Sequence, residues 1–428
     1  MIKMNYVLFS AASVLLCSCS VSKRINRSAQ HLVQQQPLNT AHVGISIMDA
    51  ATQQFVYNYQ GDKYFVPASN TKLFTCYAAM KYLGDSLPGL RYAEDVQAIY
   101  AQPTADPTLL SPDFKQHPVM DFLQGSNKKI VLGSSQWQDH AFGYGWTWDD
   151  YEASYMAERS PMPVYGNITV WKGRTALPAL FTDSVVYATN STQNKYSLHR
   201  SRNSNLFYTV ASQQAFTADA IPFVTNGLQG TAAILNQQLN GRVTVQPQLP
   251  AGATKLIHSQ PTDSLLKITM HRSDNFFAEQ TLLMVSNEKL GVMSDARIID
   301  TLLKTDLNDL PQRPKWVDGS GLSRYNLFSP QDLVTVLNKI KQSFGFNRIS
   351  AILPTGNTGT LGGYYPKLQG AIFAKTGTLS NNLALSGYLV TKKHKTYIFS
   401  IIVNNHMGQA SAIRHLIETF LTGIYEKY

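Results

Sequence analysis

Strand patterns at both ends of the chain constrain its fold more than any other feature. Apolar residues alternate with smaller or polar ones from Val43 to Ile47 and again from Phe55 to Tyr59, which predicts a β-hairpin. Three more strands are predicted near the C-terminus, over residues 371–378, 384–391 and 396–404. Because helical patterns lie between the two groups, we expect one antiparallel sheet built from both ends, in an α+β fold.

The middle of the chain differs from both ends in its sequence pattern. Residues 85–261 contain short alternating segments, frequent turns and four of the five tryptophans, which predicts an insertion of one or two mainly β subdomains. Its Trp146 and Trp148 are expected in the core of that insertion. Helices are predicted from Ser264 to Leu290 and from Gln331 to Ser343. A length of 428 residues suits two or three domains, so residues 38–84 and 262–428 are expected to form one interrupted domain.

The N-terminus resembles an export signal. Lys3 precedes an apolar run from Tyr6 to Leu16, which is too short to span a bilayer. A Leu-Cys-Ser-Cys sequence that resembles a bacterial lipoprotein cleavage box ends at Cys19. We therefore expect a signal peptide at residues 1–18, a lipid on Cys19, a tether at residues 19–37 and a periplasmic protein anchored to a membrane. Cleavage without lipidation is the alternative.

Charge and cysteine content exclude other classes. The formal net charge is +10, but the positive residues are scattered, and we predict no nucleic-acid partner. After export and lipidation only Cys76 would keep a thiol, so an internal disulfide is excluded. Cys76 lies among apolar residues of a predicted helix and is expected to be a buried packing residue.

Three short motifs carry the chemistry. Ser69 and Lys72 form an S-x-x-K motif, residues 273–275 read S-D-N, and residues 375–377 read K-T-G. S-x-x-K is common, but only the copy at Ser69 begins a helix directly after a strand pair. On a helix, positions i and i+3 share a face, so Lys72 can reach the Ser69 hydroxyl. S-D-N and K-T-G each occur once, where chance gives about a tenth of an occurrence.

The residue types fit nucleophilic catalysis. A serine hydroxyl needs an adjacent base, and Lys72 can be that base only if burial or a second positive charge lowers its pKa. Lys375 is expected to supply that second charge. Ser273 can pass a proton between the base and a leaving amine, and Asn275 can hydrogen-bond around an acyl chain.

Longer stretches carry a resemblance to a known family. Residues 271–279, 318–324 and 375–379 surround the motifs, Val-Pro-Ala precedes Ser69, and residues 145–150 read Gly-Trp-Thr-Trp-Asp-Asp. Over residues 38–428 the chain resembles the class C low-molecular-mass penicillin-binding proteins, peptidase family S13. The long insertion between the first two motifs is typical of that group.

The resemblance implies a transpeptidase-like fold and a function. The fold would have a five-stranded antiparallel sheet flanked by helices, a helical subdomain and inserted β domains. The activity would be hydrolysis of the D-Ala-D-Ala bond, or of a peptidoglycan cross-link, through an acyl-serine, with inhibition by β-lactam antibiotics. No metal and no organic cofactor is implied.

Further roles follow for substrate binding. Lys375 and Thr376 are expected to hold the free carboxylate of a C-terminal D-residue, and Gly377 to let the substrate backbone approach closely. The backbone N–H groups of Ser69 and Thr378 would form the oxyanion hole. Arg324, which lies near the cleft in the family, is expected either to pair with a carboxylate of the peptide stem or to tie down its loop.

Two other functions remain open from the sequence. A serine β-lactamase would use the same apparatus, although this chain lacks a convincing Glu-containing deacylation motif between the first two motifs. A catalytically dead, lipid-tethered cell-wall binding module is the second alternative. The lifetime of a penicilloyl adduct separates a peptidase from a β-lactamase, and the activity of a Ser69→Ala variant in cells tests the binding module.

Overall fold

A computed structural model describes residues 25–173, 175–188, 197–210, 219–250 and 254–428. The predicted signal peptide and the lipidation site Cys19 lie outside the described residues. Residues 25–34 are helical, and Ile25, Ala29 and Leu32 are buried. The predicted tether is therefore wrong from residue 25 onward, because this stretch packs into the folded body. No helix of the described residues is long and apolar enough to cross a bilayer.

The central sheet joins both ends of the chain, as the sequence predicts. Its strand order is β14-β15-β16-β1-β2, and every neighbouring pair is antiparallel. Alternating apolar residues of β1 and β16 face each other across the ladder, with Ile45 opposite Ile401. The strands are β1 (His42–Asp49), β2 (Gln54–Tyr59), β14 (Ile372–Leu379), β15 (Asn382–Val390) and β16 (Thr396–Asn404). Residues 38–59 thus depend on residues 372–404 for their pairing.

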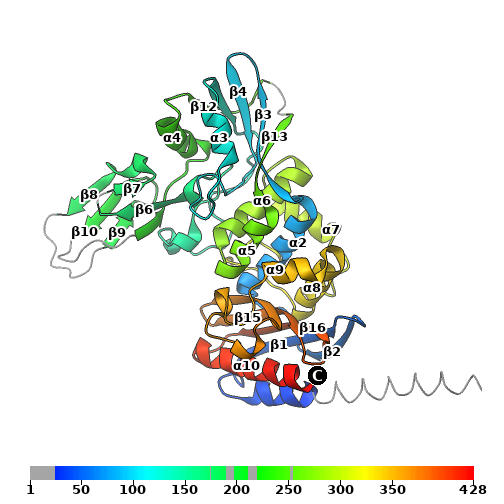
Figure 1. Ribbon diagram of the computed structural model, residues 1–428. Coiled ribbons are helices and arrows are strands. Elements are labelled where there is room, and N and C mark those ends of the chain that lie inside the picture. Colours follow the sequence, from blue (N-terminus) through cyan, green and yellow to red (C-terminus); the bar gives the residue numbers. More distant parts are fainter. Residues whose placement is uncertain (1–24, 174, 189–196, 211–218, 251–253) are drawn as a thin grey trace, which may run out of the picture.

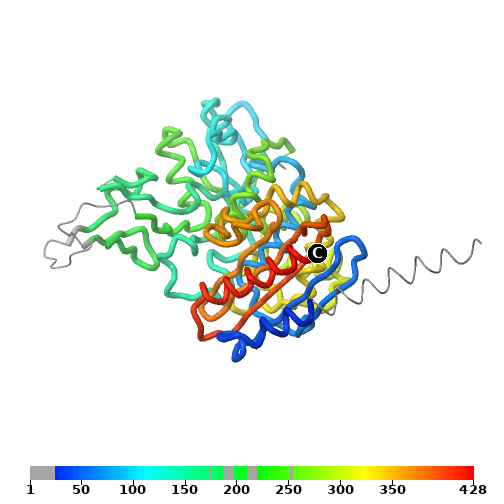
Figure 2. Tube along the Cα trace, turned by 60° about the horizontal axis from the view of Figure 1, so that its bottom comes forward, coloured from blue at the N-terminus to red at the C-terminus, as the bar shows by residue number. Residues whose placement is uncertain are grey.

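Helices cover both faces of this sheet (Figure 1). The helix of residues 25–34 and the C-terminal α10 (Ala410–Lys427) lie side by side on one face, as Figure 2 also shows, and their apolar residues pack on the sheet. The other face carries a larger helical layer, whose core includes buried residues of α2 and α8. That layer comprises α2 (Lys72–Tyr82), α5 (Thr262–Arg272), α6 (Asn275–Leu290), α7 (Asp295–Lys304), α8 (Pro330–Phe344) and α9 (Phe346–Ile352).

The helical region predicted from Ser264 to Leu290 is present, but it breaks into two helices at the S-D-N motif. Helix α5 ends at Arg272, and Ser273 takes a left-handed conformation with φ 58°. Asp274 then caps α6, where its carboxylate accepts a hydrogen bond from the N–H of Phe277 at 2.8 Å. The break places Ser273 at the end of one helix and Asn275 at the start of the next.

The insertion (residues 85–261) leaves after α2 and returns through β13 (Lys255–Pro261) into α5 (Figure 1). A mixed sheet of order β12-β5-β4-β3-β13 is its largest part. Two three-stranded sheets, β11-β6-β7 and β8-β10-β9, make up the rest. Besides β13, the helices and strands of the insertion are β3 (Ser86–Glu94), β4 (Ala98–Pro103), α3 (Pro118–Gln124), β5 (Lys129–Gly133), β6 (Ile168–Lys172), β7 (Thr175–Leu177), β8 (Val185–Ala188), β9 (Ser197–Arg200), β10 (Phe207–Val210), β11 (Asp219–Pro222), α4 (Leu228–Gln238) and β12 (Val243–Gln246). The division into domains itself stays a prediction.

Candidate active site

A tight turn presents Ser69 at the start of α2. Ala68 has φ 48°, an unfavourable conformation for a residue with a side chain, and a 3₁₀ turn from Ala68 to Thr71 leads into the helix. The turn is tied to strand β14, because the Asn70 side-chain amide donates to the carbonyl of Lys375 at 3.0 Å. Ser69 itself is half-buried. The strained conformation of Ala68 is therefore stabilised by the contact between this turn and the sheet.

Lys72 is placed as a base for Ser69. Its Nζ lies 3.0 Å from Ser69 Oγ, 2.7 Å from Asn275 Oδ1 and 2.7 Å from the carbonyl oxygen of Ser320. The side chain is fully buried, and this burial lowers the pKa of Lys72 to about 8, although Asp318, Asp274 and Glu279 oppose the shift. With that pKa about a tenth of the amine is neutral at pH 7, far more than for an ordinary lysine.

A second serine–lysine pair faces the first. Lys375 Nζ donates to Ser273 Oγ at 2.8 Å and to the carbonyl of Thr376 at 2.6 Å. Burial, together with the positive charge of Lys72, holds the pKa of Lys375 well below its usual range. A carboxylate that enters the site would favour the charged form of Lys375 again, because opposite charges stabilise each other.

The two pairs open into a cavity of about 700 Å³. The predicted residues Ser69, Ser273, Asn275, Thr376, Thr378 and Arg324 line it. Lys72 and Lys375 lie behind this wall and are completely buried. The structure thus brings every predicted site residue of the described chain to one place, although not all of them face the cavity.

Gly377 also has a packing role that the sequence does not indicate. A Cβ atom on this residue would lie 2.6 Å from the carbonyl oxygen of Pro67 and 3.1 Å from Asn70 Nδ2. The missing side chain therefore lets strand β14 pack against the turn that holds Ser69. The close approach of substrate backbone at Gly377 stays a prediction.

Arg414 was missed by sequence reasoning. It lies on α10, lines the cavity, and donates from Nη2 to Thr378 Oγ1 at 3.1 Å. No carboxylate pairs with it among the residues that the structure describes. No motif marks Arg414, and helical periodicity alone would place it on an ordinary solvent-facing surface. Its position beside the K-T-G strand depends on how α10 packs on the sheet.

The insertion also reaches the site. Thr147, Asp150 and Tyr155 line the cavity, and the carbonyl of Tyr155 accepts from Asn275 Nδ2 at 3.1 Å. The expectation that Trp146 and Trp148 belong to the core of the insertion is wrong. Trp148 is 66% exposed, and the indole N–H of Trp146 donates to Asp318, outside the insertion, at 3.0 Å.

Comparisons with known proteins agree with this geometry. The chain matches the D-Ala-D-Ala carboxypeptidase 3 (S13) family over residues 25–422. It is 25% identical to the D-alanyl-D-alanine carboxypeptidase DacB of Haemophilus influenzae over 94% of each chain. It is 27% identical to the D-alanyl-D-alanine carboxypeptidase of Actinomadura sp. strain R39 over 89% of this chain and 80% of that one.

The crystal structure of penicillin-binding protein 4 from Haemophilus influenzae shares the fold. It has a TM-score of 0.73 at 22% identity and covers 93% of this chain and 99% of its own. Another structure of that protein is a complex with a β-lactam. The fold class expected from the sequence is confirmed. Because the family match spans nearly the whole chain, the protein belongs to the D-Ala-D-Ala carboxypeptidase 3 (S13) family of serine peptidases.

Proposed function

We propose that Ser69 is the nucleophile and Lys72 its general base in the hydrolysis of D-Ala-D-Ala bonds of peptidoglycan. The observation that carries this proposal is the 3.0 Å contact between Lys72 Nζ and Ser69 Oγ, made by a buried amine whose pKa is lowered to about 8. A neutral amine at that distance can take the hydroxyl proton as Ser69 Oγ attacks the carbonyl of the penultimate residue. The mechanism then requires an oxyanion site and an acid.

The remaining residues supply both. The backbone N–H groups of Ser69 and Thr378 stabilise the oxyanion, a contribution of about 3 kcal/mol per donor. The proton passes to the leaving amine through Ser273, which accepts a hydrogen bond from Lys375. The C–N bond breaks, D-Ala leaves and an ester to Ser69 remains. Water then attacks this ester, with the same groups acting in reverse, and releases the shortened peptide.

The same site suits two related reactions. Loss of a terminal D-Ala is carboxypeptidase action, and cleavage of a D-Ala cross-link to a neighbouring stem is endopeptidase action through the same acyl-serine. β-Lactams would acylate Ser69 by opening their ring. The anchor is part of this proposal, with a lipid on Cys19 holding the enzyme to a membrane on the periplasmic side.

The proposal is tested with a peptide that ends in D-Ala-D-Ala. We expect the purified protein to release one D-Ala per peptide and to form a long-lived adduct with benzylpenicillin. Rapid turnover of the drug without peptide cleavage would favour a β-lactamase instead. A lack of both activities would leave only the binding module.

The pH dependence of acylation follows from Lys72. Its neutral form is the base, so the acylation rate should rise with pH and reach half of its maximum near the pKa of Lys72, about 8. Below that pH the rate should fall about tenfold per unit. Stopped-flow acylation by a chromogenic β-lactam over a pH series measures the profile. A rate that is flat through this region would contradict Lys72 as the titrating base.

Arg414 is expected to bind the free carboxylate of the substrate. Its guanidinium hydrogen-bonds Thr378 of the K-T-G strand, whereas Lys375 is buried behind the wall. Replacing Arg414 by Met should raise KM about 10–150-fold, since a charge-assisted hydrogen bond contributes about 1.5–3 kcal/mol. For a matched peptide that ends in an amide, the Arg414→Met variant and the unmodified protein should have the same KM. The exposed Arg313→Met change serves as the control, and an equal loss with the amide would refute this role.

Arg324 lies in the same cavity and donates to the carbonyl of Ser380 at 3.4 Å. No carboxylate pairs with its guanidinium in the described part of the chain. This supports the proposal that Arg324 meets a carboxylate of the peptide stem. The weak contact to Ser380 gives less support to the alternative in which Arg324 only ties down its loop.

A further inference from the structure

The position of Lys72 depends on the backbone around Ser320. The Ser320 carbonyl accepts a hydrogen bond from Lys72 Nζ at 2.7 Å and is completely buried. This oxygen, Asn275 Oδ1 and Ser69 Oγ all accept from the same amine. A shift of this carbonyl would therefore move the base relative to the hydroxyl that it deprotonates.

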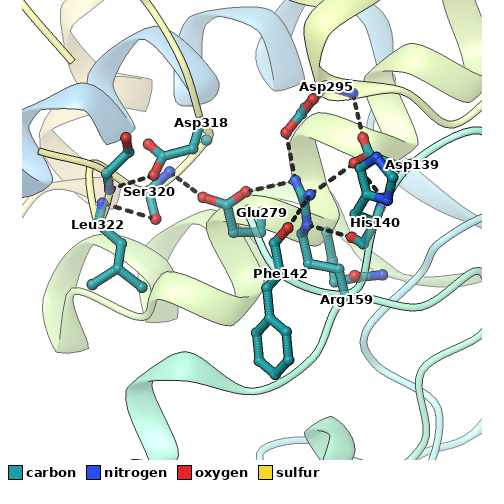
Figure 3. Close-up of polar contacts among 12 residues, drawn as sticks. Asp139, His140, Phe142, Arg159, Glu279, Asp295, Asp318, Ser320 and Leu322 are labelled. Atoms are coloured by element: carbon teal, nitrogen blue, oxygen red, sulfur yellow. Dashed lines mark hydrogen bonds and ion pairs between the residues drawn. The ribbon is translucent and has the colours of Figure 1, made fainter. Parts of the chain in front are cut away.

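Two buried carboxylates fix the peptide units on both sides of Ser320 (Figure 3). Glu279 Oε1 accepts from the N–H of Ser320 at 2.7 Å. Asp318 Oδ1 accepts from the N–H of Gly321 at 2.8 Å, and this N–H belongs to the same peptide unit as the Ser320 carbonyl. Both carboxylates are almost fully buried. They set the direction in which the carbonyl points.

The insertion supplies one donor to each of these carboxylates. Arg159 Nη1 lies 3.3 Å from Glu279 Oε2, and the guanidinium also pairs with Asp139 at 2.7 Å and Asp295 at 2.5 Å. Trp146 Nε1 donates to Asp318 Oδ2 at 3.0 Å. The guanidinium of Arg159 lies 5.5 Å from the Trp146 ring centre, so the two donors form one unit.

We propose that Arg159 and Trp146 of the insertion are positioning residues for the catalytic base, acting through Glu279, Asp318 and the Ser320 backbone. This inference rests on the proposed role of Lys72 and assigns part of the insertion a role in catalysis. It does not require the insertion to touch the reacting bond.

The charges explain why such support is needed. Buried carboxylates are costly unless a cation and hydrogen bonds compensate them. Burial and the nearby Asp318 raise the pKa of Glu279, and the positive charge of Arg159 opposes this shift. Without Arg159, Glu279 would bind a proton more readily and become a weaker acceptor for the Ser320 N–H. The loop that carries the Ser320 carbonyl would then lose one of its two fixed points.

The test compares variants that keep or remove the acceptor. In Glu279→Ala the acceptor for the Ser320 N–H is lost, whereas Glu279→Gln keeps an oxygen there. We expect Glu279→Ala and Arg159→Met to lower the limiting rate constant of acylation by benzylpenicillin about 10–100-fold, as for a misplaced catalytic group. Glu279→Gln keeps a neutral oxygen acceptor for the Ser320 N–H and should therefore lose less of the rate than Glu279→Ala. Trp146→Phe, which removes only one donor, should lower it about three- to tenfold.

The readouts separate positioning from folding. A positioning role slows the rate constant but leaves the pre-acylation dissociation constant and the final adduct yield unchanged. A structural role lowers the melting temperature and the yield, while the folded fraction reacts at the normal rate. Arg242→Met is the matched control, because this arginine binds backbone carbonyls of Ser126, Lys128 and Leu239 inside the insertion. It should destabilise without slowing acylation.

Two results would overturn the inference. One is a normal acylation rate constant in both Glu279→Ala and Trp146→Phe. The other is an equal decrease of this rate constant in Arg159→Met and Arg242→Met. If Arg159→Met does not fold, the rate constants of Glu279→Ala and Trp146→Phe decide. A failure of the proposed function looks different, because then the unmodified protein would not acylate or Lys72→Met would acylate normally.

Discussion

Lys72→Met is expected to slow acylation of Ser69 about 10³-fold, which lies within the range of about 10²–10⁴ that a general base contributes. Methionine has a similar length and suits the fully buried position of Lys72. The substitution removes the group that takes the Ser69 proton. It also leaves Asn275 Oδ1 and the Ser320 carbonyl without the donor that they share.

Stopped-flow measurement with a β-lactam gives the acylation rate, and circular dichroism checks the fold. Lys304→Met is a suitable control, because Lys304 has 62% of its side chain exposed and pairs only with Asp300 on its own helix. That variant should acylate at the normal rate. If Lys72→Met kept more than about a tenth of the normal rate, a different base would have to be found.

Gly321→Ala should disrupt both the fold and the site. Gly321 has φ 82°, and a Cβ atom there would lie 1.9 Å from the carbonyl oxygen of Ala68, the residue before the nucleophile. The left-handed conformation costs about 1–2 kcal/mol for a residue with a side chain, and the overlap with backbone adds about 1–3 kcal/mol. Relief of the overlap must move the turn of Ser69 or the carbonyl that holds Lys72. We therefore expect acylation to fall about 100-fold.

Gly84→Ala provides a matched control for backbone conformation. Gly84 has φ 68°, but nothing lies within 4 Å of the added Cβ. It should lose only the conformational part of the stability and keep the normal acylation rate. Melting curves and acylation rates of the two variants are compared directly. Equal loss of stability with normal acylation in Gly321→Ala would mean that the close approach to Ala68 does not matter.

Much of the scaffold was predictable because it depends on local sequence patterns. The alternation in residues 43–47 identifies a strand, and strand β16 has the predicted bounds 396–404. Cys76 is fully buried, as its apolar neighbours predict. The i, i+3 spacing of Ser69 and Lys72 predicted a contact that the structure shows at 3.0 Å. These features depend on residues close in sequence or on periodicity, which a single chain displays.

The rest depends on long-range packing that leaves no local signal. Arg159 directly follows Glu158 in the insertion, and nothing near it in the sequence indicates that its partners include Glu279, which lies 120 positions away. Arg414 reaches the site only because α10 crosses the sheet. The packing role of Gly377 could not be predicted for the same reason, since the atoms that exclude a side chain there belong to Pro67 and Asn70.

The central claim is that Ser69 is acylated, and intact-protein mass spectrometry after incubation with benzylpenicillin tests it most directly. The account predicts a stable mass increase of one penicillin molecule in the soluble domain and no increase in Ser69→Ala. Peptide mapping should place the adduct on Ser69. An adduct that persists in Ser69→Ala, or its complete absence in the folded wild-type protein, would contradict the assignment of the nucleophile.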